Sequence, residues 1–191
     1  MFGHLYLCGK CDRWHTNLAG GVILSSEGLV LTNYHVMNFP EARLFGAMTR
    51  EGTTYLVESV VASSKENDLA LVQLAEAIDL PTVSLADSAS IGDQVTVISH
   101  PDSHFFLQTT GEIARFNLSQ PHKYRRMQIT ADFARGSSGC GVFDSDGKLV
   151  GLVTATNSVY YTQEEEIQKD LQMVVKTCIP LESIEELLST E

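Results

Sequence analysis

The chain has 191 residues, of which 43% are hydrophobic and 19% are charged. This length and composition are typical of one large globular domain or two small ones, and they exclude an intrinsically disordered chain. The net charge of −11 argues against nucleic-acid binding, which needs a basic surface to neutralise phosphates. No apolar run approaches the roughly 18 residues that a membrane-spanning helix requires, and so we expect no membrane insertion.

Residues 1–18 carry a Cys-x-x-Cys pair, Cys8 and Cys11, with His15 four residues further on. A closed zinc site needs four ligands, and the sequence offers no second Cys-x-x-Cys or histidine pair to complete one. Cys178 could be the fourth ligand, or it could form a disulfide with one of the two thiols. The three residues are therefore weak metal candidates, with ordinary thiols or a structural clip as the alternatives, and we assign no metal.

Short apolar runs, many of them β-branched, recur along the chain and are bounded by Gly, Asp, Ser or Pro. Regular short strands without long helices between them predict an all-β sandwich or barrel. Residues 81–92 contain Pro, Ser and Asp and are interpreted as a connection between two groups of strands. The expected strands are residues 20–24, 29–32, 55–57 with 60–61, 69–72, 94–98, 112–114, 127–129, 141–143, 149–153 and 173–175.

Helical periodicity is clear only near the end of the chain. Leu181, Ile184, Leu187 and Leu188 form an i, i+3, i+6, i+7 apolar stripe with acidic residues on the opposite face. This end is also acidic, because residues 159–191 contain eight acids and two lysines, or −6 of the total charge of −11. We interpret these charges as a solvated loop and helix face.

Three separate segments carry the residue types of acyl-transfer chemistry, in the order His, Asp, Ser. His35 comes just after an apolar strand, Asp68 just before another, and Ser138 lies in the glycine-rich loop 135–141. A serine hydroxyl needs a neutral imidazole to take its proton, and an acid must orient that imidazole. The developing oxyanion needs N–H donors, for which the backbone amides of Gly136 and Ser138 are candidates. The combination predicts a nucleophilic serine enzyme with its site between the two strand groups.

These motifs resemble those of the trypsin-like serine proteases, and in particular the HtrA/DegP protease domain. Residues 28–36 (GLVLTNYHV) resemble the strand that leads to the catalytic histidine of that family, and residues 67–72 (NDLALV) match its aspartate motif. Residues 135–139 (RGSSG) resemble its nucleophile loop, and residues 80–95 resemble its connection between barrels. The resemblance covers about residues 19–189.

The resemblance implies an all-β fold of two antiparallel six-stranded β-barrels with a short C-terminal helix. We expect the barrels at residues 19–80 and 93–178, with the connection at 81–92 between them. The helix would occupy residues 179–191, and the segment 1–18 would precede the first barrel. All of these parts would form one catalytic unit.

By the same resemblance, the activity is that of a serine endopeptidase that cleaves polypeptides and uses no cofactor. His35 would be the general base and acid, Asp68 would orient it, and Ser138 would form the acyl-enzyme. Ser138 is preferred to Ser137 because the family places a glycine directly after the nucleophile. Cys140 stands at the family's second glycine, two residues past the nucleophile, and so it does not indicate a cysteine protease.

The resemblance also gives four candidates for the substrate pocket: Asp132 and Phe133 before the nucleophile, and Thr154 and Thr156 on a later strand. Asp132 lies six residues before Ser138, the separation at which trypsin carries its specificity acid, and would favour a basic substrate side chain. HtrA-like loops usually present an apolar side chain at the next position, here Phe133. That arrangement would favour an apolar or small substrate side chain, and both alternatives stay open.

Compartment and assembly are only weakly indicated. The resemblance favours an extracytoplasmic location, periplasmic or secreted, although no signal peptide is visible at the start of the chain. We expect no PDZ module after the C-terminal helix. The oligomeric state stays open between a monomer and a homotrimer.

Two rival interpretations bear on the function. An α/β-hydrolase esterase has the chain order Ser, Asp, His and a G-x-S-x-G elbow, whereas here the order is reversed and Cys140 stands two residues after Ser138. The other rival is a peptide-binding or chaperone-like module of the trypsin fold that is inactive or only conditionally active. Loss of a triad residue is the usual mark of such a protein, and His35, Asp68 and Ser138 are all present.

Overall fold

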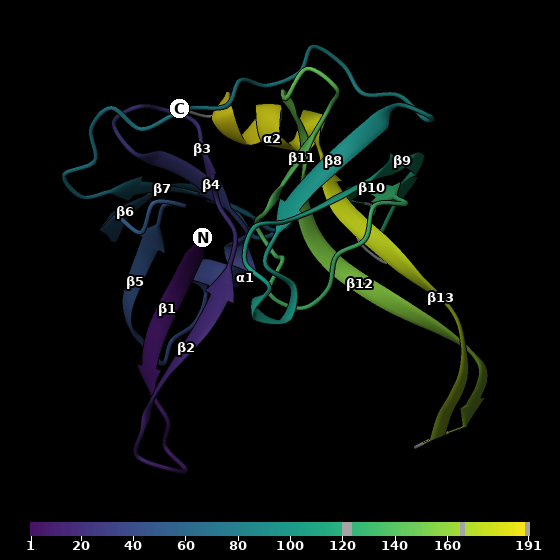
Figure 1. Ribbon diagram of the computed structural model, residues 1–191, viewed down its shortest axis with the longest axis horizontal. Coiled ribbons are helices and arrows are strands. Elements are labelled where there is room, and N and C mark those ends of the chain that lie inside the picture. Colours follow the sequence, from purple (N-terminus) through teal and green to yellow (C-terminus); the bar gives the residue numbers. More distant parts are fainter. Residues whose placement is uncertain (120–123, 165–166, 190–191) are drawn as a thin grey trace.

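The computed structural model describes residues 1–119, 124–164 and 167–189. Two antiparallel β-sheets lie side by side, one from the first half of the chain and one from the second, and a short helix ends the fold (Figure 1). The prediction of an all-β protein with two sheet units and a C-terminal helix is confirmed.

The first half of the chain forms a sheet of seven strands, one more than the resemblance implies. Its strands are β1 (Phe2–Leu7), β2 (Trp14–Ala19), β3 (Val22–Ile23), β4 (Leu29–Thr32), β5 (Ala42–Met48), β6 (Thr54–Ser64) and β7 (Leu69–Leu74). Their order across the sheet is β2-β1-β5-β6-β7-β4-β3. The segment 1–18 therefore belongs to this sheet. β1 joins it because β1 pairs with both β2 and β5 and buries its alternate residues Phe2 and His4.

The second half of the chain forms the closed six-stranded barrel that the resemblance implies. Its strands are β8 (Gln94–Ser99), β9 (Leu107–Leu118), β10 (Arg125–Ile129), β11 (Gly141–Phe143), β12 (Leu149–Glu164) and β13 (Ile167–Pro180). Their order around the barrel is β10-β13-β12-β11-β8-β9. A short 3₁₀ turn, Pro101–Ser103, follows β8. The barrel interior is filled by buried apolar side chains from all six strands, among them Val97, Ile113, Met127 and Val142.

One hydrophobic cluster joins the two halves. Leu31 of β4 and Leu71 of β7 pack in it with Leu152 of β12, Ile179 of β13 and Ile184 of α2 (Leu181–Leu188). All five side chains are fully buried, and each such burial contributes about 1.5–3 kcal/mol. Because His35 follows β4, Asp68 precedes β7 and Thr154 lies on β12, this cluster sets the position of the two halves of the candidate site relative to each other.

Backbone hydrogen bonds join the connection between the sheets to both of them. The Val83 N–H donates to the Ile23 carbonyl at 3.0 Å, and the Ala86 N–H donates to the Leu149 carbonyl at 3.0 Å. The segment therefore passes from the edge strand β3 of the N-terminal sheet to β12 of the barrel.

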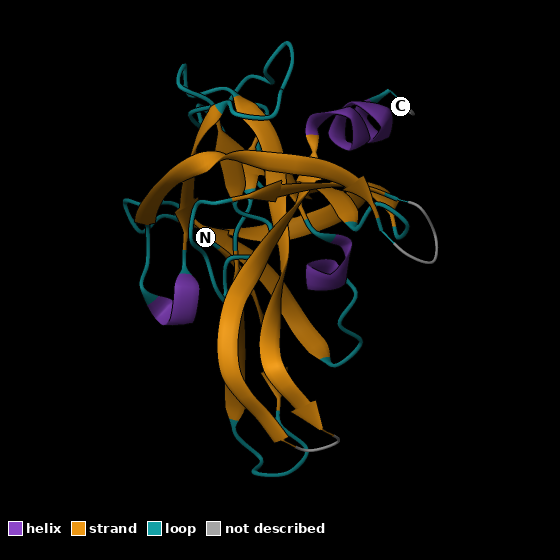
Figure 2. Cartoon of the chain, turned by 90° about the vertical axis from the view of Figure 1, so that its right-hand side faces the viewer, coloured by secondary structure: helices purple, strands orange, loops and turns teal. Residues whose placement is uncertain are grey.

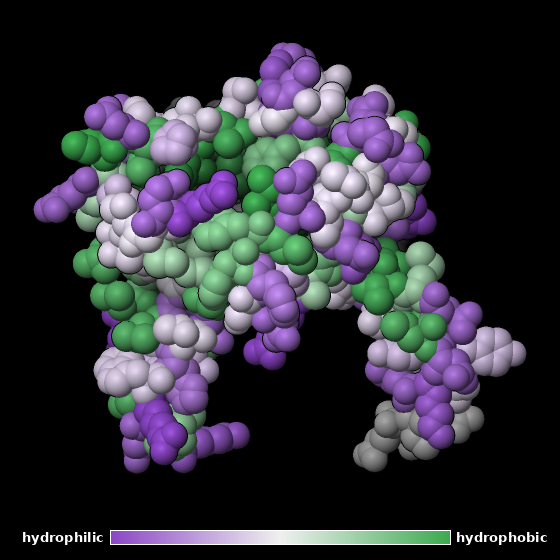
Figure 3. Space-filling model, viewed as in Figure 1, coloured by the Kyte–Doolittle hydropathy of each residue, from purple (hydrophilic) through white to green (hydrophobic). Residues whose placement is uncertain are grey.

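Two hairpins project beyond the sheets in the same direction (Figures 1 and 2). One joins β1 to β2, and the other consists of the long strands β12 and β13, which continue well past the barrel. The space-filling view shows them as two projections separated by open space (Figure 3). None of the helices in the described part of the chain is long and apolar enough to cross a membrane.

Candidate active site

His35 and Asp68 are brought together by the pairing of β4 with β7. His35 lies in α1 (Tyr34–Met37), a single turn that begins directly after β4, and Asp68 directly precedes β7. The two strands are antiparallel, with Thr32 opposite Ala70, so the end of one strand adjoins the start of the other. The histidine and aspartate motifs therefore meet where the end of β4 adjoins the start of β7.

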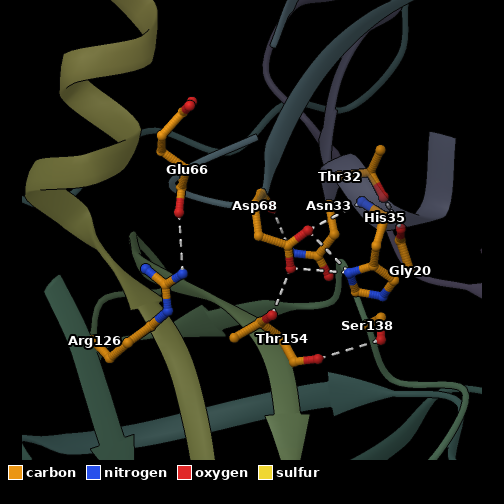
Figure 4. A network of polar contacts seen from close by, with 9 residues as sticks. All are labelled: Gly20, Thr32, Asn33, His35, Glu66, Asp68, Arg126, Ser138 and Thr154. Atoms are coloured by element: carbon orange, nitrogen blue, oxygen red, sulfur yellow. Dashed lines mark hydrogen bonds and ion pairs between the residues drawn. The ribbon is translucent and has the colours of Figure 1, made fainter. Parts of the chain in front are cut away.

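The Asp68 carboxylate binds His35 through both the ring and the backbone (Figure 4). The His35 Nδ1 atom lies 2.9 Å from Oδ2 and 3.0 Å from Oδ1, and the His35 backbone N–H donates to Oδ1 at 3.0 Å. Asp68 adopts the left-handed backbone conformation, with φ of 61°, and its carbonyl accepts hydrogen bonds from the Asn33 side chain and the Tyr34 N–H. These contacts fix the Nδ1 side of the imidazole, so that Nε2 faces Ser138 (Figure 4).

Thr154 of β12 extends this network from the barrel. Its hydroxyl donates to the Asp68 Oδ2 atom at 2.6 Å, which leaves the carboxylate held between Thr154 and His35. The sequence suggested Thr154 as a wall of the substrate pocket and did not reveal this contact. No spacing rule connects a threonine to an aspartate 86 positions earlier, because the contact depends on how the barrel packs against the sheet.

Ser138 lies beside the His35 ring in a loop that is tied to both halves of the molecule (Figure 4). Its carbonyl accepts a hydrogen bond from the Gly20 N–H at 2.6 Å, and the next residue, Gly139, donates its N–H to the Val153 carbonyl at 3.0 Å. The Ser138 hydroxyl is 3.5 Å from the Thr154 carbonyl oxygen, the outer limit of a hydrogen bond. This long contact leaves the hydroxyl free to turn toward the imidazole.

The loop before Ser138 leaves two backbone N–H groups unpaired. The Ser137 N–H donates to the Ala134 carbonyl at 3.1 Å, whereas within the described residues the N–H groups of Gly136 and Ser138 have no hydrogen-bond partner. Gly136 has φ of 98°, and a Cβ atom there would lie 2.6 Å from the His100 carbonyl oxygen. Only glycine fits this position without strain, because a side chain would disfavour the backbone conformation and collide with His100.

The other two candidate nucleophiles of the loop are buried. Ser137 has no exposed surface, and its hydroxyl has no partner among the described residues. Cys140 is 2% exposed, and burial raises the pKa of its thiol to about 12. A thiol in this state is neither accessible nor ionised at neutral pH, which leaves Ser138 as the accessible nucleophile of the loop.

A small pocket of about 130 Å³ adjoins Ser138, and three of the four pocket candidates line it: Phe133, Thr154 and Thr156. The fourth candidate does not. The Asp132 side chain is 84% exposed and forms an ion pair with the Lys176 amine at 3.0 Å. The Lys176 amine also donates to the Phe133 carbonyl at 2.8 Å. In the structure, Asp132 is therefore outside the lining of this pocket.

A larger hollow of about 500 Å³ contains His35 and Ser138 and is bounded by β2 on one side. β2 contributes residues 16–19 to this lining, which the sequence did not indicate because the segment was expected to precede the first barrel. His100 lines the same hollow, and burial lowers its pKa to about 4. The hollow is therefore lined by one exposed histidine, His35, and by two buried ones, His4 and His100.

The weak metal candidates lie together at the end of the β1–β2 hairpin. The ligand atoms of Cys8, Cys11 and His15 are all within 4.8 Å of one another. Cys178 is fully buried in β13 of the barrel and is not part of this group. All four cysteines are free thiols, so the suggestions of Cys178 as a fourth ligand or a disulfide partner are both wrong.

Comparison with known proteins identifies the family. The family model described as a trypsin-like peptidase domain matches residues 19–152. The chain belongs to the trypsin-like serine protease family. Within this family it is HtrA/DegP-like, as the sequence motifs predict.

The curated relatives are longer proteins. A probable periplasmic serine endoprotease, DegP-like, of Marinomonas sp. is 33% identical over 152 residues, which are 78% of this chain and 31% of the relative. The periplasmic pH-dependent serine endoprotease DegQ of Escherichia coli is 29% identical over 144 residues, 72% of this chain and 31% of the relative. The chain thus spans about a third of the length of the curated relatives it matches.

Solved structures of HtrA-type proteases share the fold. The HtrA-type protease AlgW with a tripeptide has a TM-score of 0.74 at 24% identity, covering 99% of this chain and 59% of AlgW. A second AlgW structure, with a decapeptide, has a TM-score of 0.75 at 22% identity. Since these identities are low, the likeness supports the fold of this trypsin-like protease and not its specificity.

Proposed function

We propose that this HtrA-like protein is a serine endopeptidase with Ser138 as its nucleophile, His35 as general base and acid, and Asp68 as the orienting acid. The observation that carries the proposal is the continuous chain of contacts from Thr154 through Asp68 to His35, with Ser138 beside the ring. A carboxylate on Nδ1 keeps the proton on that nitrogen and leaves Nε2 as the base that a serine nucleophile requires.

The reaction follows from this arrangement. The Ser138 hydroxyl oxygen attacks the scissile carbonyl carbon while its proton passes to the Nε2 atom of His35. The tetrahedral oxyanion receives hydrogen bonds from the free N–H groups of Gly136 and Ser138. The C–N bond then breaks as His35 returns the proton to the leaving amine. Water, deprotonated by His35, cleaves the resulting acyl-enzyme and releases the second product.

We further propose that the pocket beside Ser138 takes a small or medium-sized apolar substrate side chain. Its volume is about 130 Å³, and the apolar side chains of Phe133 and Val153 form part of its wall. The charged residue in its lining is Arg135, which is positive, and the lining contains no acid. A basic substrate side chain would meet this charge and find no acid in the pocket to pair with.

Active-site labelling tests the proposed nucleophile. A fluorophosphonate probe should form a covalent bond to Ser138 in the wild-type chain, and mass spectrometry of the labelled peptide should place the adduct on that residue. Ser138→Ala should abolish both labelling and peptide cleavage. Ser137→Ala is the matched control, because it removes a buried hydroxyl that has no partner, and it should keep both signals.

The result also separates the protease from its rival. A folded wild-type chain that neither reacts with the probe nor cleaves denatured casein would support a peptide-binding or chaperone-like module instead. Labelling that persists in Ser138→Ala would reject the nucleophile proposed here. A cleavage profile on a peptide library would then test the pocket, and a preference for Arg or Lys before the cleaved bond would contradict the apolar assignment.

A further inference from the structure

The β1–β2 hairpin ends in a group of metal-binding side chains that the peptidase chemistry does not use. The register places Tyr6 opposite His15 and Leu7 opposite Trp14, and the turn of residues 8–13 closes the hairpin. The Cys8 N–H donates to the Arg13 carbonyl at 2.9 Å, and this bond holds the base of the turn together. Cys8, Cys11 and His15 therefore face one another across the turn.

The three ligand atoms have the spacing that one tetrahedral ion needs. The Cys11 Sγ atom lies 3.1 Å from the His15 Nε2 atom, and all three ligand atoms lie within 4.8 Å of one another. Two atoms bound to a single zinc ion at about 2.1–2.3 Å, at a tetrahedral angle, are about 3.5–3.8 Å apart. Shifts of a few tenths of an ångström to one ångström in exposed side chains would bring the group to this geometry.

The turn prepares Cys8 as a thiolate ligand. The backbone N–H groups of Lys10 and Cys11 donate hydrogen bonds to the Cys8 sulfur. Such N–H donors support the negative charge of a metal-bound sulfur. On the other side of the group, the Tyr6 ring stacks against His15 with the two ring centres 5.6 Å apart, which limits the rotation of the imidazole.

The end of the hairpin buries little apolar surface. Its turn residues from Gly9 to Arg13 are exposed, and Trp14 is 57% exposed. A two-stranded ribbon without a hydrophobic face is only marginally stable in water. β2 nevertheless lines the hollow that contains His35 and Ser138, so the position of this ribbon affects one wall of the candidate active site.

We propose that Cys8, Cys11 and His15 bind one Zn²⁺ ion, which clips the end of the β1–β2 hairpin. Binding displaces one proton from each thiol, and the two thiolates with the neutral imidazole then balance the charge of the ion. Water completes the tetrahedron at the open side of the exposed turn. Two sulfur ligands and one nitrogen ligand form a set that favours Zn²⁺ over hard cations such as Mg²⁺ or Ca²⁺.

Metal analysis of the untagged full-length chain tests the site. Protein purified under reducing conditions, loaded with Zn²⁺ and dialysed against a weak chelator should retain one zinc ion per chain. Cys8→Ser, Cys11→Ser and His15→Ala should each lose it. Lys10→Ala and His104→Ala are the controls and should retain it, because Lys10 contributes only its backbone N–H and His104 lies outside the group. Circular dichroism should show that the sheets persist in all five variants.

Cobalt substitution gives a second readout that does not depend on stability or activity. Co²⁺ bound in place of Zn²⁺ should produce a thiolate-to-metal charge-transfer band and the intense visible bands of a tetrahedral site, and Cys8→Ser should weaken the former. A wild-type chain that retains no zinc would overturn the proposal. So would equal zinc retention in all three ligand variants, or a pale octahedral cobalt spectrum. None of these results bears on Ser138 labelling, so the two proposals fail separately.

Discussion

The two halves of the molecule contribute to the candidate site in different ways. The N-terminal sheet supplies His35 and Asp68 from the ends of two paired strands, and the bonds between them lie within that sheet. The barrel supplies Ser138 from a loop and Thr154 from a strand, and these reach the pair only across the junction between the halves. The acid–base pair therefore depends on one sheet, whereas the alignment of the nucleophile depends on how the two halves pack.

The largest expected effect comes from a substitution in the His35–Asp68 pair of the N-terminal sheet. Asp68→Asn keeps the shape of the side chain but removes the charge that selects the His35 tautomer. By analogy with other triads, kcat/KM for a peptide substrate should fall roughly 10⁴-fold. Asp87→Asn, at an exposed carboxylate that pairs with Lys148 on the barrel surface, should leave kcat/KM unchanged. If Asp68→Asn retained more than a tenth of the activity, Asp68 would not be the group that orients His35.

The next effect concerns the barrel alone. Gly136→Ala places a Cβ 2.6 Å from the His100 carbonyl oxygen, at a position with φ of 98°, and should displace the amides that face the oxyanion. We expect kcat to fall roughly 100- to 1000-fold, the usual cost of a lost oxyanion donor. Gly52→Ala is the matched control, since Gly52 has φ of 91° with open space around it. If both variants lost kcat equally, backbone strain and not the oxyanion loop would be the cause.

A smaller effect should follow from removing the hydrogen bond between Thr154 of the barrel and Asp68 of the N-terminal sheet. Thr154→Val removes the hydroxyl that donates to Asp68 at 2.6 Å while keeping the size of the side chain. A hydrogen bond to a charged group contributes about 1.5–3 kcal/mol, so kcat/KM should fall at least roughly tenfold. Thr110→Val, at an exposed position of β9, controls for the loss of a barrel hydroxyl. An unchanged kcat/KM in Thr154→Val would mean that the sheet orients the pair by itself.

The smallest effect distinguishes the histidines of the two halves. His35 is half exposed, whereas burial lowers the pKa of His100 in the folded barrel to about 4. The unfolded chain takes up a proton on His100 at about pH 6.5, before the folded chain does. Stability should therefore be full above about pH 6.5 and should decline toward about pH 4, by about 1 kcal/mol between pH 7 and pH 5.5.

Urea unfolding of the wild-type chain and of His100→Gln at these pH values measures the difference. The variant lacks the titrating group, and so its stability should decline less over this range. An equal decline in the two proteins would assign the loss to other groups.

Much of the candidate site could be predicted from the sequence, because the backbone around each of its residues is determined by neighbouring residues in the chain. The strand before His35, the strand after Asp68 and the glycines around Ser138 each dictate their own stretch of backbone through apolar runs and turn chemistry. The apolar stripe from Leu181 likewise fixed the position of the C-terminal helix. Such features depend on neighbours within about ten residues, which is the range over which periodicity and turn preferences act.

Features that depend on contacts between residues far apart in the sequence could not be predicted in this way. β1 and β2 become part of the N-terminal sheet only through the pairing of β1 with β5, and Asp132 pairs with Lys176 on the distant strand β13. Neither contact has a signature in spacing or composition.

The sequence by itself determined which side chains are the candidates for the chemistry of this trypsin-like protein, and on which kind of element each one lies. The tertiary structure decided how these side chains meet. It places the Thr154 hydroxyl in hydrogen-bond contact with Asp68 and, among the described residues, leaves the N–H groups of Gly136 and Ser138 without partners. It also gathers Cys8, Cys11 and His15 at one turn, away from Cys178. The physical reason is that hydrophobic burial brings the two halves together without regard to sequence distance, and hydrogen bonds form only between groups that this packing has placed in reach.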